Sequence, residues 1–111
     1  MFDSFAPLGP CIVNKNLIKI GEAGDINLSL QTLVNSEIRQ SSNSGDMLFN
    51  VASLVSFTSQ GTTLYPGDII FTGTPEGTGM GMKPHRWLQN NDIVKCVIED
   101  LGYIENKIIF E

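Results

Sequence analysis

Apolar and polar residues alternate through part of the first half of the chain in a way that predicts strands. From Ile26 to Gln31 every second residue is apolar, and a period of two over this length indicates a strand with one buried face. Asn35 and Ser36 stand where a hairpin turn would fall, so residues 37–40 are predicted to form the return strand. A short apolar run predicts another strand at residues 11–13. Residues 14–24 are predicted to be a loop, with a short strand at residues 17–20 as the alternative.

One helix is predicted over residues 47–60. Apolar residues and one threonine recur there at helical spacing and would form a stripe along one face: Met47, Leu48, Val51, Leu54, Val55 and Thr58. Asn50 is a candidate N-cap residue. Gly61 can end the helix because glycine adopts the left-handed conformation without strain.

The second half of the chain predicts short strands separated by turns. Residues 65–68 have the Pro-Gly centre of a type II turn, and a buried strand is expected next at residues 69–72. Residues 73–87 form a glycine- and proline-rich loop, and residues 92–99 and 103–110 are spaced as a hairpin. The fold class predicted is mixed α/β and β-rich, with one main helix.

Composition narrows the classes of function. The chain has 111 residues and a formal net charge of −5, so one domain is the expected number. The excess of acidic residues argues against binding to nucleic acid or to an anionic membrane. No apolar run approaches the ~20 residues that span a bilayer, and the N-terminus lacks the pattern of a signal peptide.

The titratable residues do not form a recognisable catalytic or metal-binding pattern. Cys11 and Cys96 lie far apart among apolar neighbours, which predicts buried strand thiols in a reducing compartment rather than a disulfide or zinc framework. His85, the single histidine, is expected on an exposed loop. No two carboxylates stand two residues apart, the spacing that would place both on one face of a strand, so no metal ligands are predicted.

Two irregular segments are candidates for ligand contact. Residues 73–79 are rich in glycine and threonine, and exposed N–H groups in such a loop can bind an anion; a purely structural turn is the alternative. Residues 5–10 contain a stiff Pro-x-Gly-Pro sequence, which either positions a ligand or forms a wall of the fold.

Several motifs in order resemble the fumarylacetoacetate hydrolase superfamily. Residues 2–10 (FDSFAPLGP) resemble its "FDxFxPLGP" element, and residues 40–49 (QSSNSGDMLF) resemble its "Q-x-x-N-x-x-x-M-x-F" segment. Residues 65–79 (YPGDIIFTGTPEGTG) are similar to "PGDII-x-TGTPxGVG", and the stretch from residue 92 to 107 resembles the closing hairpin. Thr78 stands where valine is usual, and residues 90–91 (Asn-Asn) replace the usual turn before Asp92.

The resemblance implies a mixed β-roll, usually dimeric, that acts on small 2-keto acids with Mg²⁺ or Mn²⁺. It implies that Thr74 contacts substrate, supported by Gly73, while Pro7 and Leu8 line the neighbouring wall and Gln40 lies in the surrounding shell. In the family, the Glu-x-Glu pair, an Asp, a His-Glu dyad and a Lys precede the "FDxFxPLGP" element. We therefore expect this chain to be the C-terminal part of a catalytic domain, without the metal-binding part.

The chain alone is accordingly expected to lack metal-dependent turnover. The alternatives are a non-catalytic dimerisation module and a truncated or degenerate gene product. The expected compartment is intracellular and reducing, mitochondrial or cytoplasmic, and a targeting segment is not expected within these residues.

Overall fold

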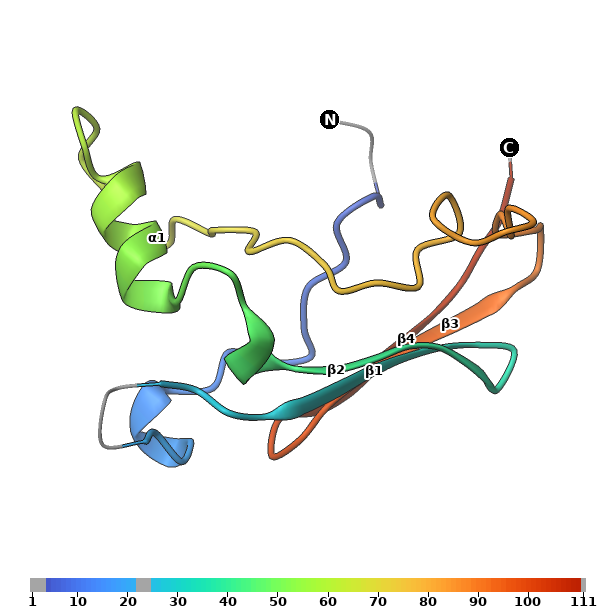
Figure 1. Cartoon of the computed structure of the whole chain (residues 1–111), viewed down its shortest axis with the longest axis horizontal. Coiled ribbons are helices and arrows are strands. Elements are labelled where there is room, and N and C mark those ends of the chain that lie inside the picture. The colour runs from blue at the N-terminus through green and yellow to red at the C-terminus, as the bar shows by residue number, and fades with distance from the viewer. Residues whose placement is uncertain (1–3, 22–24, 111) are drawn as a thin grey trace.

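A four-stranded antiparallel sheet is the main feature of the computed structural model, which describes residues 4–21 and 25–110. The strand order is β2-β1-β3-β4. Over the described residues the elements are η1 (Lys15–Leu17), β1 (Ser29–Val34), β2 (Glu37–Asn43), η2 (Ser44–Asp46), α1 (Val51–Thr58), β3 (Ile93–Ile98) and β4 (Gly102–Lys107). Figure 1 shows α1 standing away from the sheet, with the chain after it returning above the strands in an irregular path.

Two hairpins form the sheet, as predicted. Asn35 (φ 50°) and Ser36 (φ 70°) connect β1 to β2 in the left-handed region, which suits a tight turn between twisted strands. Asp100 (φ 61°) and Gly102 (φ 91°) have the same sign of φ between β3 and β4. β1 pairs with both β2 and β3, so it lies in the interior of the sheet.

β2 contains a bulge that the sequence did not predict. Thr32 of β1 pairs with Gln40, but the next residue, Leu33, pairs with Ile38. Arg39 therefore has no partner in β1. An extra residue of this kind bends a strand and redirects the side chains beside it.

The helix is shorter than predicted at its N-terminal end. Asn50 is the N-cap, as expected, and its Oδ1 accepts a hydrogen bond from the Ser53 N–H at 2.9 Å. The cap residue has extended backbone (φ −69°, ψ 168°), so the helix begins after it and Met47 and Leu48 lie outside. The helix also ends before the predicted residue 60: its last residue is Thr58 and its C-cap is Ser59. Gly61 has the expected left-handed conformation (φ +76°), but it lies two residues beyond the cap and does not itself end the helix.

The strands predicted at residues 11–13 and 69–72 are wrong. The described backbone there is irregular, and Ile12 and Phe71 are 98% and 68% exposed. A strand needs a neighbour to hydrogen-bond with, and neither segment is paired with a strand of the described sheet. Residues 17–20 are also not a strand: η1 ends at Leu17, and Ile20 forms a single bridge with Ile26.

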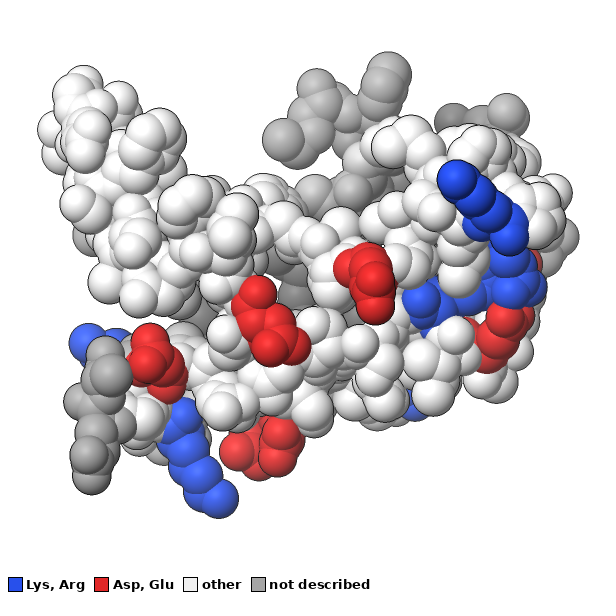
Figure 2. Space-filling model, in the orientation of Figure 1, with Lys and Arg blue, Asp and Glu red and all other residues white. Residues whose placement is uncertain are grey.

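The hydrophobic core is small. Among the described residues only Leu28 and Val34 are buried hydrophobics, and α1 has no buried side chain. Cys11 is exposed and Cys96 half-buried, so the prediction of two buried thiols is wrong. The space-filling view shows a broad uncharged surface, with basic side chains towards the two ends (Figure 2). Large apolar side chains that are more than half exposed include Phe5, Leu8, Leu48, Phe49, Phe57 and Phe71.

Candidate substrate-binding loop

The glycine-rich loop packs against the bulge of β2. Gly77 has a φ of +97°, and a Cβ at this position would collide with the backbone carbonyl of Arg39. Glycine is therefore required at this position for two reasons: the backbone has a positive φ, and the loop lies too close to the Arg39 carbonyl to leave room for a side chain. This contact fixes the loop over the strand that carries Gln40.

Gln40 and Thr74, two of the predicted site residues, are joined by a hydrogen bond. The Gln40 side-chain amide donates to Thr74 Oγ1 at 2.8 Å and to the Pro75 carbonyl at 2.9 Å. Gln40 is half-buried beside the bulge, whereas Thr74 is exposed. One amide thus holds the loop at two consecutive residues and sets the position of the threonine hydroxyl.

Gly73 leaves open space beside Thr74. Its φ is +92°, which favours glycine, and a Cβ built there would meet no atom within 4 Å. Gly73 therefore differs from Gly77: both have a backbone conformation that favours glycine, but only Gly77 has neighbouring atoms that leave no room for a Cβ. The exposed face of the loop is the side from which a ligand can reach the Thr74 hydroxyl.

Pro7 and Leu8 are exposed in the irregular N-terminal segment, and Leu8 is 65% exposed. The same segment contributes Gly9 to a separate cavity against β3 and β4. The described contacts join Gln40 to Thr74 but do not join Pro7 or Leu8 to them.

An ion-pair cluster, which the sequence reasoning missed, anchors the end of the long loop to β2. Arg86 donates to both carboxylate oxygens of Glu37, at 2.5 and 2.8 Å, and Arg39 Nε lies 3.5 Å from Glu37 Oε2. The hydrogen bonds from Arg86 lower the pKa of Glu37 and raise that of Arg86. Arg86 and Glu37 are 49 residues apart in the sequence, so no local sequence pattern predicts that they pair.

Two other carboxylates hold turns of the sheet. Asp92 accepts from the Gln89 N–H at 2.8 Å and from the Asn35 side chain at 2.7 Å, which lowers its pKa. Glu99 accepts from the Ser29 N–H at 3.0 Å, and its pKa is lowered mainly by that bond. Both groups are therefore structural.

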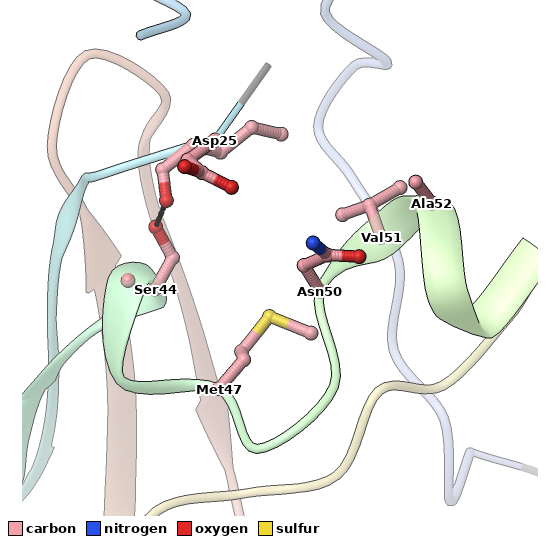
Figure 3. Close-up of a pocket in the computed structure, with 8 residues that line it drawn as sticks. Asp25, Ser44, Met47, Asn50, Val51 and Ala52 are labelled. Carbon is pink, nitrogen blue, oxygen red and sulfur yellow. Dashed lines mark hydrogen bonds between the residues drawn. The ribbon is translucent and has the colours of Figure 1, made fainter. Parts of the chain in front are cut away.

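A cavity of 140 Å³ lies between the end of β2 and the start of α1 (Figure 3). Two of its polar side chains, those of Ser44 and Asn50, hydrogen-bond to nearby backbone groups. Ser44 Oγ donates to the Ile26 carbonyl and accepts from the Leu28 N–H, and Asn50 caps α1. We assign this cavity a structural role.

The family's metal ion does not fit the residues present. Across residues 4–21 and 25–110, no three His, Cys, Asp or Glu side chains lie close enough together to hold an ion. The same part of the chain also contains no helix of sufficient length and hydrophobicity to cross a membrane.

Comparison with known families identifies the chain. A model described as "Fumarylacetoacetate (FAA) hydrolase C-terminal" matches residues 1–109. The chain belongs to the fumarylacetoacetate hydrolase family. Oxaloacetate tautomerase Fahd2a, mitochondrial, of Rattus norvegicus is 49% identical over 97% of this chain, and fumarylacetoacetate hydrolase domain-containing protein 2 of Pongo abelii is 45% identical. The resemblance to the family's C-terminal part is confirmed, and the similar relatives are of the domain-containing protein 2 branch.

The chain covers only a third of these relatives: the aligned part is 33% of each. Among solved structures, fumarylacetoacetate hydrolase from Exiguobacterium antarcticum matches 99% of this chain with a TM-score of 0.90 and 37% identity, over 38% of its own length. Maleylpyruvate hydrolase from Sphingobium sp. SYK-6, in complex with manganese (II) ion and pyruvate, matches with a TM-score of 0.83 at 30% identity, over 37% of its length. The β-rich α/β arrangement is therefore that of the family.

Proposed function

We propose that this chain is the C-terminal third of a catalytic domain that acts on small 2-keto acids, with oxaloacetate tautomerisation as the reaction. The hydrogen bond between Gln40 and Thr74 is the observation that supports it, because it presents a positioned hydroxyl on an open loop. The names of the similar relatives support the reaction type. They also support a mitochondrial location, and we propose that the complete domain forms a homodimer.

The proposed role of Thr74 follows from its hydroxyl. Its oxygen already accepts from Gln40, so its hydrogen is available to donate to a substrate carboxylate or keto oxygen. Gln40 is then a positioning residue, and Gly73 gives the loop its conformation. Pro7 and Leu8 would form the neighbouring wall once the rest of the domain covers the exposed apolar surface.

We propose that the metal ion is held outside this chain. Mg²⁺ or Mn²⁺ prefers several oxygen ligands, and the described residues offer no such cluster. A net charge of −5 also repels an anionic keto acid. The chain alone should therefore not turn over oxaloacetate in a metal-dependent way.

A chimera tests this proposal. In the rat relative, the matched C-terminal third would be replaced by this chain, and oxaloacetate tautomerisation would be measured with Mg²⁺ or Mn²⁺. We expect the chimera to turn over substrate and EDTA to abolish the activity, while the 111-residue chain alone stays at the uncatalysed rate. EDTA-sensitive turnover by the isolated chain, or an inactive but folded chimera, would contradict the proposal.

Thr74→Val in the chimera tests the hydroxyl itself, since valine keeps the shape and removes the donor. A hydrogen bond to a charged group contributes about 1.5–3 kcal/mol, so kcat/KM should fall about 10- to 100-fold. Thr78→Val is the matched control, because Thr78 is an exposed threonine of the same loop without an assigned contact to substrate. Equal decreases in kcat/KM for the two variants would show that the Thr74 hydroxyl does not contact the substrate.

A second candidate function is that of a non-catalytic association module. It is favoured by the exposed apolar side chains in and next to α1, such as Phe49 (61%) and Phe57 (72%), because large exposed apolar surface can mark a site of association. Sedimentation of the chain alone, and mixed with the full-length rat relative, tests it. A monomer in both samples would eliminate this candidate.

A further inference from the structure

Cys11 and Cys96, far apart in sequence, line the same cavity. The cavity has a volume of 220 Å³ and lies between the N-terminal segment and the β3–β4 hairpin. Figure 1 shows the N-terminal segment descending towards the sheet. Neither cysteine is part of the Gln40–Thr74 site, so the cavity is a separate feature of the fold.

Residues from two parts of the chain line this space. On the N-terminal side, the lining residues are Gly9, Cys11 and Val13, which belong to the irregular segment before η1. On the sheet side, Cys96 pairs with Ile104, and both line the cavity together with Ile98. The two cysteines therefore face the cavity from opposite walls.

The two thiols differ in exposure. Cys11 is exposed, whereas Cys96 is half-buried in β3, with its Sγ 3.8 Å from Thr32 Oγ1. Lys95, the neighbouring cation, points to the other face of the sheet, where its Nζ lies 3.8 Å from the centre of the Tyr103 ring. One thiol is thus accessible to a reagent in solution, and the other is held in place behind it.

We propose that Cys11 and Cys96 form a reversible thiol-modification site that reacts with low-molecular-weight disulfides of the glutathione class. The Cys11 thiolate attacks a sulfur of the small disulfide, forming a mixed disulfide and releasing one small thiol. The Cys96 thiolate then attacks the Cys11 sulfur and releases the second small thiol. Two protein thiols are oxidised to one disulfide, and one small disulfide is reduced to two thiols.

The final cross-link ties the N-terminal segment to β3. A disulfide spans Cα atoms about 4.4–6.8 Å apart, and the segment around Cys11 forms no strand, so it can shift across the cavity to close the bond. Pro7 and Leu8 are close to Cys11 in sequence, and the cross-link would restrict them as well. The proposal does not depend on the activity proposed above.

The test uses the reduced full chain, incubated with oxidised glutathione and then analysed by intact mass and peptide mapping. We expect the wild type to lose two hydrogen atoms, to contain a peptide linking Cys11 to Cys96, and to melt at a higher temperature than the reduced form. Dithiothreitol should reverse all three changes. A wild type that accumulates only a mixed disulfide at Cys11, or a covalent dimer, would overturn the proposal.

Single variants distinguish the order of the two steps. Cys96→Ser should stop at a stable mixed disulfide on Cys11, because the second thiol is missing. Cys11→Ser should react several-fold more slowly than Cys96→Ser, because its remaining thiol is half-buried. Equal modification of both variants would contradict the assignment of Cys11 as the attacking thiol, and circular dichroism of each variant confirms that it is folded.

Discussion

The sheet (β1–β4) and the helical layer, defined here as residues 47–88, differ in how their backbone N–H and C=O groups are hydrogen-bonded. The sheet pairs its strands within the chain and surrounds the two buried side chains, Leu28 and Val34. The helical layer has hydrogen bonds inside α1 and in a few turns, and no residue of α1 is buried, although Leu54 and Thr58 are half-buried. The layer is attached to β2 at the glycine loop and at Arg86.

This difference shows which part of the fold the chain stabilises by itself. Hydrogen bonds form wherever two segments pair, but apolar burial needs a second surface. The sheet and the glycine loop find their partners in this chain, and most of α1 does not. The apolar side chains of the helical layer therefore lack a covering surface among the described residues.

The largest expected effect is on the free energy of unfolding, and it is tested by two Leu→Ala substitutions, one next to the sheet and one in the helical layer. Leu28→Ala removes a side chain that is 4% exposed, whereas Leu48→Ala removes one that is 89% exposed. The first should lower the free energy of unfolding by about 2–5 kcal/mol, and the second by less than about 0.5 kcal/mol. Urea unfolding followed by circular dichroism measures both; similar losses would mean that the helical layer is packed in solution.

The attachment of the glycine loop is tested by Gly77→Ala against Gly73→Ala. Both positions have positive φ, so alanine should cost about 1–2 kcal/mol at either. Only at Gly77 does the new Cβ collide with the Arg39 carbonyl, which adds about 1–3 kcal/mol and should lift the loop.

The readout is the side-chain amide resonance of Gln40 in solution NMR. In Gly77→Ala we expect its chemical shift to become that of a solvent-exposed side-chain amide. In Gly73→Ala we expect the chemical shift to stay unchanged. Identical spectra for the two variants would show that the loop is not held at Gly77.

A smaller effect is expected from the helix cap. Asn50→Ala removes the acceptor of the Ser53 N–H and should destabilise α1 by about 1 kcal/mol. Because α1 has no buried side chain, the loss should appear as reduced helical ellipticity without a shift in sheet unfolding. Asn50→Asp, which replaces the amide oxygen with a carboxylate oxygen and so keeps an acceptor, is the control. A lower unfolding midpoint for the sheet in Asn50→Ala would show that the two layers are coupled.

The smallest effect is a pH dependence at the Arg86 attachment. The pKa of Glu37 lies below its ordinary value of 4.5 because Arg86 hydrogen-bonds to the carboxylate. The pair therefore stabilises the docked loop fully above pH 4.5, and this stabilisation is lost as the pH falls through the lowered native pKa. Trp87, the single tryptophan, is next to Arg86 and reports the change by its fluorescence.

Two variants assign that transition. The groups that face Glu37 are Arg86 and Arg39, while Asp92 holds the nearby Gln89 N–H and also has a lowered pKa. Glu37→Gln should remove the acid transition of Trp87 that belongs to Glu37. Asp92→Asn should leave it in place. A transition that survives in Glu37→Gln and disappears in Asp92→Asn would assign the anchor to Asp92 instead.

Features governed by neighbouring residues were predictable. The turn at residues 65–68 has the expected Gly67 with φ 102° and the hydrogen bond from the Asp68 N–H to the Tyr65 carbonyl. Asn91 occupies the left-handed region (φ 75°), as expected for the residue that replaces a turn glycine. The N-cap at Asn50 was also predicted from its residue type, although the predicted helix began too early, at residue 47.

Features that depend on distant segments were not predictable from the pattern. The apolar residues 11–13 and 69–72 have strand-like sequences but pair with no strand within residues 4–21 and 25–110. The family resemblance pointed to Gln40 and Thr74, yet the bulge at Arg39 and the fit of Gly77 against it have no local signature. Glu37 and Arg86 likewise meet only after the loop has folded back over β2.

The sequence by itself thus determined the hairpins, the cap, the turns and the membership in a family, because each depends on residue types at fixed short spacing or on motifs in order. Only the tertiary structure decided that Gln40 reaches Thr74 across 34 residues, that two distant cysteines share one cavity, and that α1 buries no side chain. The physical reason is that burial and long-range hydrogen bonds depend on which surfaces meet, and a linear pattern does not specify that.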